Sequence, residues 1–120
     1  MTKYYVDFLY PGAFVSESET RAIDTPLDVG TVPRGAYGYT VWERTERTVD
    51  GETLRGERRD VRSVVFGHVR TVPEMRARNH DGKYNILLSN MTGNGWPKVV
   101  ETVRGTFLPL TANLEVREAP

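Results

Sequence analysis

The residues best suited to ligand chemistry in this sequence lie between Ser89 and Pro97. The stretch combines hydroxyl, amide and indole groups with two glycines. Glycine and asparagine tolerate positive φ angles, so backbone N–H groups of such a loop can converge on a ligand beside a flat indole. We therefore predict a ligand-binding loop made of Asn90, Thr92, Gly93, Asn94, Gly95 and Trp96. The alternative is a tight connection between two strands, with the indole in the core.

Three residues elsewhere in the chain fit the same predicted site. Arginine makes paired hydrogen bonds to phosphate or carboxylate, and an indole stacks on flat ligands. We predict that Arg59, Arg62 and Trp42 are ligand-binding residues as well. The combined set favours a small anionic, nucleotide-like ligand, and a host protein is the alternative partner.

Residues typical of catalysis are few. The two histidines, His68 and His80, have no second ligand at metal-site spacing, and cysteine is absent. No phosphate-binding loop ending in Lys-Ser/Thr and no nucleophile elbow is present. We therefore expect no enzyme, no catalytic residue, no metal and no cofactor. A small hydrolase with an unrecognised site is an alternative, because residues distant in sequence can assemble such a site.

Charge weighs against nucleic acid as the partner. Basic and acidic residues balance at 16 each, so the chain lacks the excess positive charge that drives phosphate binding. A nucleic-acid-binding module is nevertheless a second alternative, because four arginines cluster between residues 55 and 62. An acidic segment at Glu17-Ser18-Glu19 would suit a basic protein partner. No apolar run is long enough to cross a membrane, and we expect a cytoplasmic protein.

The elements that must position these residues are mainly strands, because apolar and polar residues alternate along most of the chain. We predict a mainly β fold, α+β at most: one domain over residues 1–120, with an antiparallel sheet, a protruding central β-hairpin and one short helix. The helix is expected at 71–78, a loop at 25–34, and residues 13–23 are a strand or a surface segment. The predicted strands are 4–10, 37–42, 64–69, 83–88, 98–103, 106–108 and 114–116.

The hairpin is the most specific structural prediction. Asp50-Gly51 is a preferred two-residue turn, and a turn centred there makes the numbers of opposed residues sum to 101. Shifting the register by one residue would oppose like charges, which disfavours it. The predicted charge pairs are Glu46–Arg55, Arg44–Glu57 and Glu43–Arg58. Nearer the core, we predict a one-residue β-bulge near Arg59 and Asp60, which would oppose Val41 with Val61.

Three short stretches resemble a known group of proteins. Residues 10–17, 50–52 and 88–95 are similar to segments of small uncharacterised proteins encoded by bacteriophages and prophages. The resemblance assigns no function to any residue. It implies a non-enzymatic counter-defence protein that inhibits a host protein or sequesters a ligand in the host cytoplasm. An unpaired strand edge would also favour a homodimer.

Overall fold

The computed structural model describes residues 1–12, 19–71 and 98–118. Most of these residues lie in antiparallel strands, so the predicted mainly β fold is confirmed. The chain divides into two compact units, Met1–Val64 and Val65–Pro120, with the division inside strand β5 (Arg59–Thr71). The predicted strand at 83–88 and nearly all of the predicted helix lie outside the described residues. Thr71, the expected first residue of that helix, is the last residue of β5.

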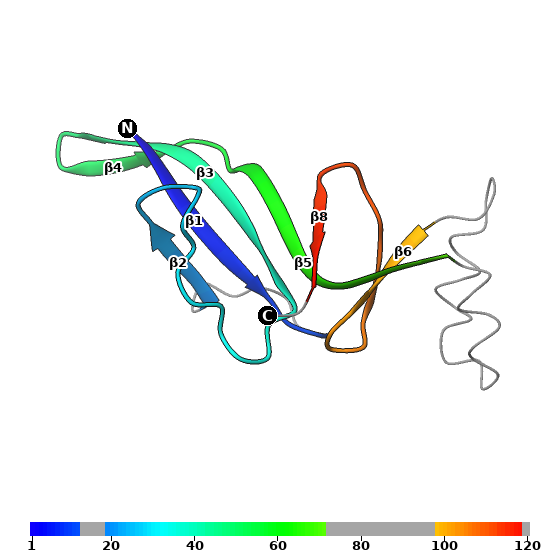
Figure 1. Ribbon diagram of the computed structural model, residues 1–120. Helices are drawn as coiled ribbons and strands as arrows, with labels where there is room; N and C mark the ends of the chain where they lie inside the picture. Colours follow the sequence, from blue (N-terminus) through cyan, green and yellow to red (C-terminus); the bar gives the residue numbers. More distant parts are fainter. Residues whose placement is uncertain (13–18, 72–97, 119–120) are drawn as a thin grey trace. The chain divides into compact units, whose positions relative to one another are not determined.

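Four further strands build the first unit around β5 (Figure 1). They are β1 (Thr2–Leu9), β2 (Thr20–Ile23), β3 (Gly38–Val49) and β4 (Glu52–Arg55). The order in the sheet is β2-β1-β3-β5, and β4 pairs with β3. Residues 24–37 form no strand, which agrees with the loop predicted over 25–34.

The apolar core of this unit lies on one face of the sheet. Because residues alternate between faces, directly opposed residues such as Val6 and Val41 lie on the same side. Buried apolar residues on this face include Val6, Phe8, Val41, Tyr39 and Val64, whereas Trp42 is buried on the opposite face, where it lies opposite Tyr5. Two arginines of the sheet contact the segment 24–37. Arg21 of β2 donates hydrogen bonds to the carbonyl oxygens of Val29 and Thr31. Arg62 of β5 donates a hydrogen bond to the carbonyl oxygen of Pro26.

The hairpin has the predicted turn and register. β3 and β4 pair through Glu46–Arg55, Arg47–Leu54, Thr48–Thr53 and Val49–Glu52, all of which sum to 101. Asp50 and Gly51 both have positive φ, at 52° and 81°, as a type I′ turn requires. Glu46 and Arg55 form the predicted ion pair, with 3.4 Å between Oε1 and Nε. Local turn chemistry was therefore sufficient to predict this part of the molecule.

The other two predicted charge pairs are wrong. β4 ends at Arg55, so the ladder does not continue far enough to oppose Arg44 with Glu57 or Glu43 with Arg58. The arginines and glutamates of this region find different partners. The observed ion pairs are Arg44–Glu46, Glu43–Arg59 and Arg58–Asp7.

The predicted one-residue bulge near Arg59 and Asp60 is also wrong. The return strand instead breaks at residues 56–58, between β4 and β5. Beyond the break, Thr40 Oγ1 and Ser63 Oγ are 2.9 Å apart and therefore lie on the same face of the sheet. A single extra residue would have placed these two side chains on opposite faces. Compared with a ladder that keeps the register of the hairpin tip, the chain returning from the tip to Ser63 therefore contains an even number of additional residues.

The second unit contains the end of β5 and three short strands. They are β6 (Lys98–Thr102), β7 (Phe107–Pro109) and β8 (Leu114–Arg117), which confirm the strands predicted in these regions. Within this unit β6 pairs with both β5 and β7. Gly105 has a φ of 79° and permits the turn after β6. In the described part of the chain, no helix is long and apolar enough to cross a membrane.

Candidate functional site

The predicted binding residues fall into two groups. The six predicted loop residues between Asn90 and Trp96 lie outside the described residues. Of the remaining three, Trp42 is only 7% exposed, and its Nε1 has no hydrogen-bond partner among the described residues. Arg59 is exposed and paired with Glu43, whereas the Nη2 of Arg62 donates to Pro26 O over 2.7 Å. These three side chains thus already make contacts inside their own unit.

A buried carboxylate marks the base of the hairpin. Asp7 of β1 is 3% exposed, and both of its oxygens accept hydrogen bonds. Thr20 Oγ1 donates to Oδ1 over 2.8 Å, and Arg58 Nη1 donates to Oδ2 over 2.7 Å. Arg58 belongs to the break between β4 and β5 and reaches across β3 to make this bond. The ion pair therefore holds the return chain of the hairpin against β1.

Aromatic rings line the path of this arginine. The rings of Tyr5 and Trp42 are stacked, with centroids 4.5 Å apart. The guanidinium of Arg58 lies 4.7 Å from the centroid of Trp42, and that of Arg44 lies over both rings. Burial lowers the pKa of Arg58, but hydrogen bonds and charge from Asp60 and Asp7 outweigh it, so its pKa is raised above its ordinary value. The arginine therefore stays charged at neutral pH.

This cluster of Asp7, Arg58, Trp42, Tyr5 and Arg44, which we call the anchor, is built for positioning. Both Asp7 oxygens are occupied and the indole is buried, so neither group is presented to a substrate. Sequence reasoning missed it because its key residues are 51 positions apart. One signal was present: an aspartate in the middle of a strand of large apolar residues needs a partner when buried.

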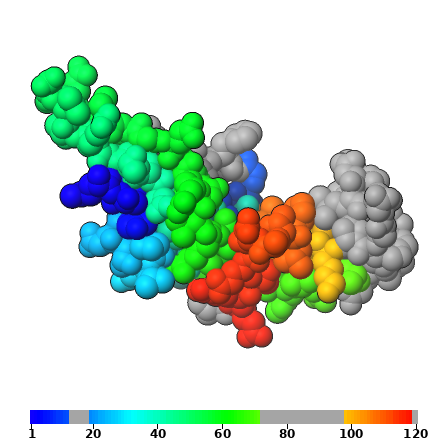
Figure 2. All heavy atoms as spheres, turned by 90° about the horizontal axis from the view of Figure 1, so that it is seen from above, coloured from blue at the N-terminus to red at the C-terminus, as the bar shows by residue number. Residues whose placement is uncertain are grey.

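The strands beyond the anchor form a projecting arm, defined as residues 47–55 (Figure 2). Backbone hydrogen bonds between Met1 and Glu46 close the ladder between β1 and β3, and β3 continues past them to Val49. From there the ribbon has two strands only. All nine arm residues are exposed.

The two faces of the arm differ. Cross-strand partners lie on the same face, so Thr48 and Thr53 mark a polar face. The opposite face carries Arg47, Val49, Glu52 and Leu54. Its two aliphatic side chains, Val49 and Leu54, are diagonal neighbours and are 44% and 42% exposed. One face of a solvent-surrounded ribbon thus presents an aliphatic pair.

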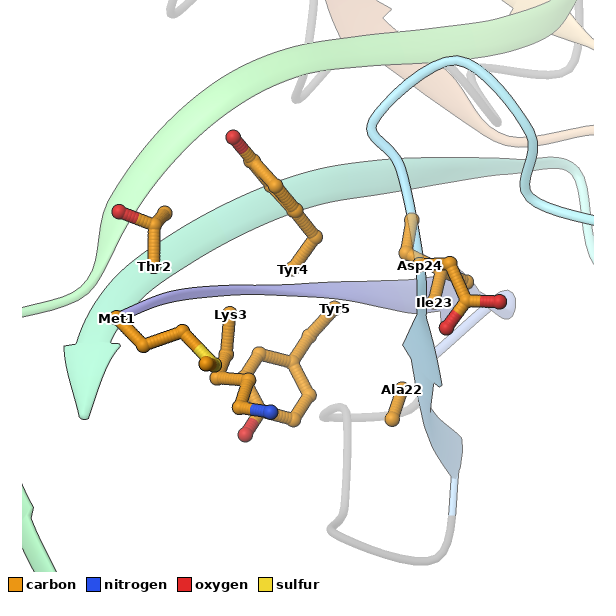
Figure 3. A pocket seen from close by; sticks show the side chains of 8 residues that line it. All are labelled: Met1, Thr2, Lys3, Tyr4, Tyr5, Ala22, Ile23 and Asp24. Carbon is orange, nitrogen blue, oxygen red and sulfur yellow. The ribbon is translucent and has the colours of Figure 1, made fainter. Parts of the chain in front are cut away.

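Two open hollows flank the start of β1. One, of about 290 Å³, lies beside β1 and β2, where Lys3 and Tyr5 point to one side of β1 and Thr2 and Tyr4 to the other (Figure 3). The second, of about 490 Å³, lies at the base of the arm and is lined by Met1, Lys3, Glu46, Arg47, Thr48 and Thr53. Among the described residues, no cluster of histidine and acidic side chains is arranged to hold a metal ion.

The chain matches no family model, no curated protein and no solved structure. Its function must therefore be argued from geometry. The two features that geometry provides are the buried anchor and the exposed arm that it holds.

Proposed function

We propose that this chain is a non-enzymatic binding protein that contacts another protein through the aliphatic face of the arm. The observation that carries the proposal is the pair of exposed side chains, Val49 and Leu54, on a ribbon that extends past the end of β1. Aliphatic groups gain free energy when a partner removes them from water, at about 25 cal/mol per Å² of apolar surface.

The construction of the arm supports a contact role. An isolated two-stranded hairpin is only marginally stable in water. Here the ribbon is held at its base by the Asp7–Arg58 ion pair and at its tip by the turn at Asp50 and Gly51. A pre-ordered ribbon loses little conformational entropy on binding, which favours affinity. The arm is therefore suited to present a rigid edge and face.

The charges of this region support a protein partner better than a nucleotide-like ligand or a nucleic acid. Four arginines at and near the base of the arm already pair with carboxylates: Arg44, Arg55, Arg58 and Arg59. Binding phosphate would require these pairs to separate or the carboxylates to lie beside phosphate, and both cost free energy. A counter-defence inhibitor of a host protein, as the resemblance implies, is one setting for such a binder.

A photo-crosslinking experiment tests the proposal. A photoreactive amino acid replaces Val49 in one sample and Leu27 in a matched control, because Leu27 is an even more exposed aliphatic residue of the same unit. Each protein is irradiated in bacterial cell extract, and adducts are identified by mass. We expect a discrete adduct from position 49, reduced by excess unlabelled wild-type protein and not by excess V49D/L54D protein.

Two results would contradict the proposal. Equal adducts from positions 49 and 27 would show non-specific contact between exposed groups. If excess V49D/L54D protein reduces the position-49 adduct as much as excess wild-type protein does, the aliphatic face does not make the contact. Circular dichroism of V49D/L54D establishes that the competitor is folded.

A further inference from the structure

The outer edge of β4 has an ordered set of hydrogen-bonding groups. Gly56 N donates to Thr45 O over 2.8 Å, so this residue pair belongs to the hydrogen-bonded set of the hairpin ladder. Hydrogen-bonded and non-hydrogen-bonded pairs alternate in an antiparallel ladder. The N–H and C=O groups of Thr53 and Arg55 therefore point away from β3. Among the described residues, β3 is the only strand paired with β4.

The sequence of β4 leaves this edge able to pair. Proteins commonly protect exposed edges with proline, lysine or a bulge. β4 reads Glu-Thr-Leu-Arg, and its ladder with β3 is regular over all four residues. Thr53 and Arg55 thus offer two N–H donors and two C=O acceptors with the spacing of an ordinary β-strand.

We infer that the strand completing this edge is β4 of a second copy of this chain, paired antiparallel about a two-fold axis at Leu54. Thr53 of each copy then lies opposite Arg55 of the other, and four backbone hydrogen bonds form. The two Leu54 side chains meet directly on the aliphatic face. Arg47 and Arg55 balance Asp50 and Glu52, so the two arms carry no net charge to repel one another.

The geometry selects this register over its symmetric alternative. A two-fold axis across paired strands keeps equivalent faces on the same side, so it passes beside a residue of β4, and Thr53 and Leu54 are the two central positions. With the axis at Thr53, only one hydrogen-bonded pair joins residues of the two β4 strands, and Glu52 of one copy lies opposite Leu54 of the other. The axis at Leu54 forms two such pairs and sets Glu52 opposite Gly56, which has no side chain. Hydrogen bonding and side-chain contact both favour the axis at Leu54.

The inference rests on the proposed function, because the joined ribbon unites the aliphatic pairs of two arms into one contact surface. A four-residue strand buries little area, so the dimer should be weak and concentration-dependent. Sedimentation analysis from about 10 μM to about 1 mM should therefore show wild-type monomer converting to dimer.

Two proline variants separate edge pairing from damage to the arm. T53P removes an outward-facing N–H of β4 and leaves the bonds between β3 and β4 intact. T48P is the matched control, because the N–H of Thr48 faces the edge of the arm opposite to β4. Glu46, two residues earlier in the same strand, shows this direction, since its N–H donates to Met1 O. We expect T53P to weaken dimerisation about tenfold or more and T48P to leave it within about twofold of wild type. Equal behaviour of the two variants would overturn the inference.

Disulfide trapping tests the register directly, since the chain has no cysteine of its own. L54C should form a dimer under mild oxidation, because opposed residues of a non-hydrogen-bonded pair lie about 4.5 Å apart between Cα atoms. T53C should not, because the two Thr53 positions are diagonal and exceed the reach of a disulfide. A T53C dimer in place of an L54C dimer would refute the axis at Leu54.

The two proposals fail separately. Wild-type protein that stays monomeric at every concentration would refute the pairing of β4 edges, and the crosslinking at position 49 would still test binding to another protein. A dimer with the predicted L54C disulfide but no specific heterologous adduct would support the pairing and contradict the proposed partner.

Discussion

The anchor and the arm share strand β3, but their residues lie in opposite surroundings. In the anchor, a buried carboxylate, stacked rings and two guanidinium groups contact one another. In the arm, all nine residues are exposed, and its two aliphatic side chains, Val49 and Leu54, are 44% and 42% exposed. Because both regions share the long strand β3, ordering the anchor also orders the arm. The comparison indicates that stability is concentrated at the base and contact surface at the tip.

The largest effect is expected from W42A. Trp42 is buried, stacks on Tyr5 and lies under Arg58. Removing such a side chain usually costs about 3 to 5 kcal/mol of unfolding free energy. Chemical denaturation of W42A and wild type measures the change. A loss below about 1 kcal/mol would show that the aromatic stack does not stabilise the base.

D7A should have the next largest effect. It removes the acceptor of two hydrogen bonds, one of which comes from the charged Arg58. Because Arg58 is nearly half exposed and can return to water, we expect a loss of about 2 to 3 kcal/mol rather than the larger cost of a fully buried pair. D60A is the control, since Asp60 is an exposed partner of the same arginine and should cost less than about 1 kcal/mol.

A smaller, local effect is expected from G51V. Gly51 has a φ of 81°, which a β-branched residue adopts only with strain. The arm should open more readily, by about 1 to 2 kcal/mol, without a comparable loss in the anchor. Amide hydrogen exchange resolves the two regions. Faster exchange at Leu54 together with unchanged exchange at Val41 is expected, and equal acceleration at both would contradict separate stabilities.

The smallest effect on stability, with a large effect on binding, is expected from V49S/L54S. Both side chains are more than 40% exposed, so their replacement should change the unfolding free energy by less than about 1 kcal/mol. Binding of the partner trapped at position 49 should fall at least about tenfold. Retained binding would place the contact surface outside the arm, for instance in the predicted loop at 89–97.

The arm was predictable from the sequence to the level of register, whereas the anchor was not. Asp50-Gly51 and the charges at Glu46 and Arg55 are local signals, and their consequences extend over only a few residues. The interruption at 56–58 has no comparable signal. There, Gly56 lies so close to Thr45 that a Cβ would collide with it, and Arg58 turns away to Asp7. The predicted Glu43–Arg58 pair was wrong because a distant aspartate, Asp7, pairs with Arg58, and Arg44 pairs with Glu46 in place of Glu57.

The predicted binding residues teach the same lesson. Residue type identified Trp42, Arg59 and Arg62 as able to bind a ligand, and each of them has contacts within its own unit. Chemical capability is a property of the side chain, but availability depends on which groups surround it. The loop between Asn90 and Trp96 remains a prediction of the sequence.

Periodicity and turn chemistry were enough to establish a mainly β chain, the positions of most strands and the Asp50-Gly51 turn, because those signals act between near neighbours in the chain. The partner of Asp7, the burial of Trp42 and the break before β5 emerged from folding alone. They depend on free energies of contacts between residues far apart in sequence, and no local pattern encodes which of several arginines will reach a buried carboxylate.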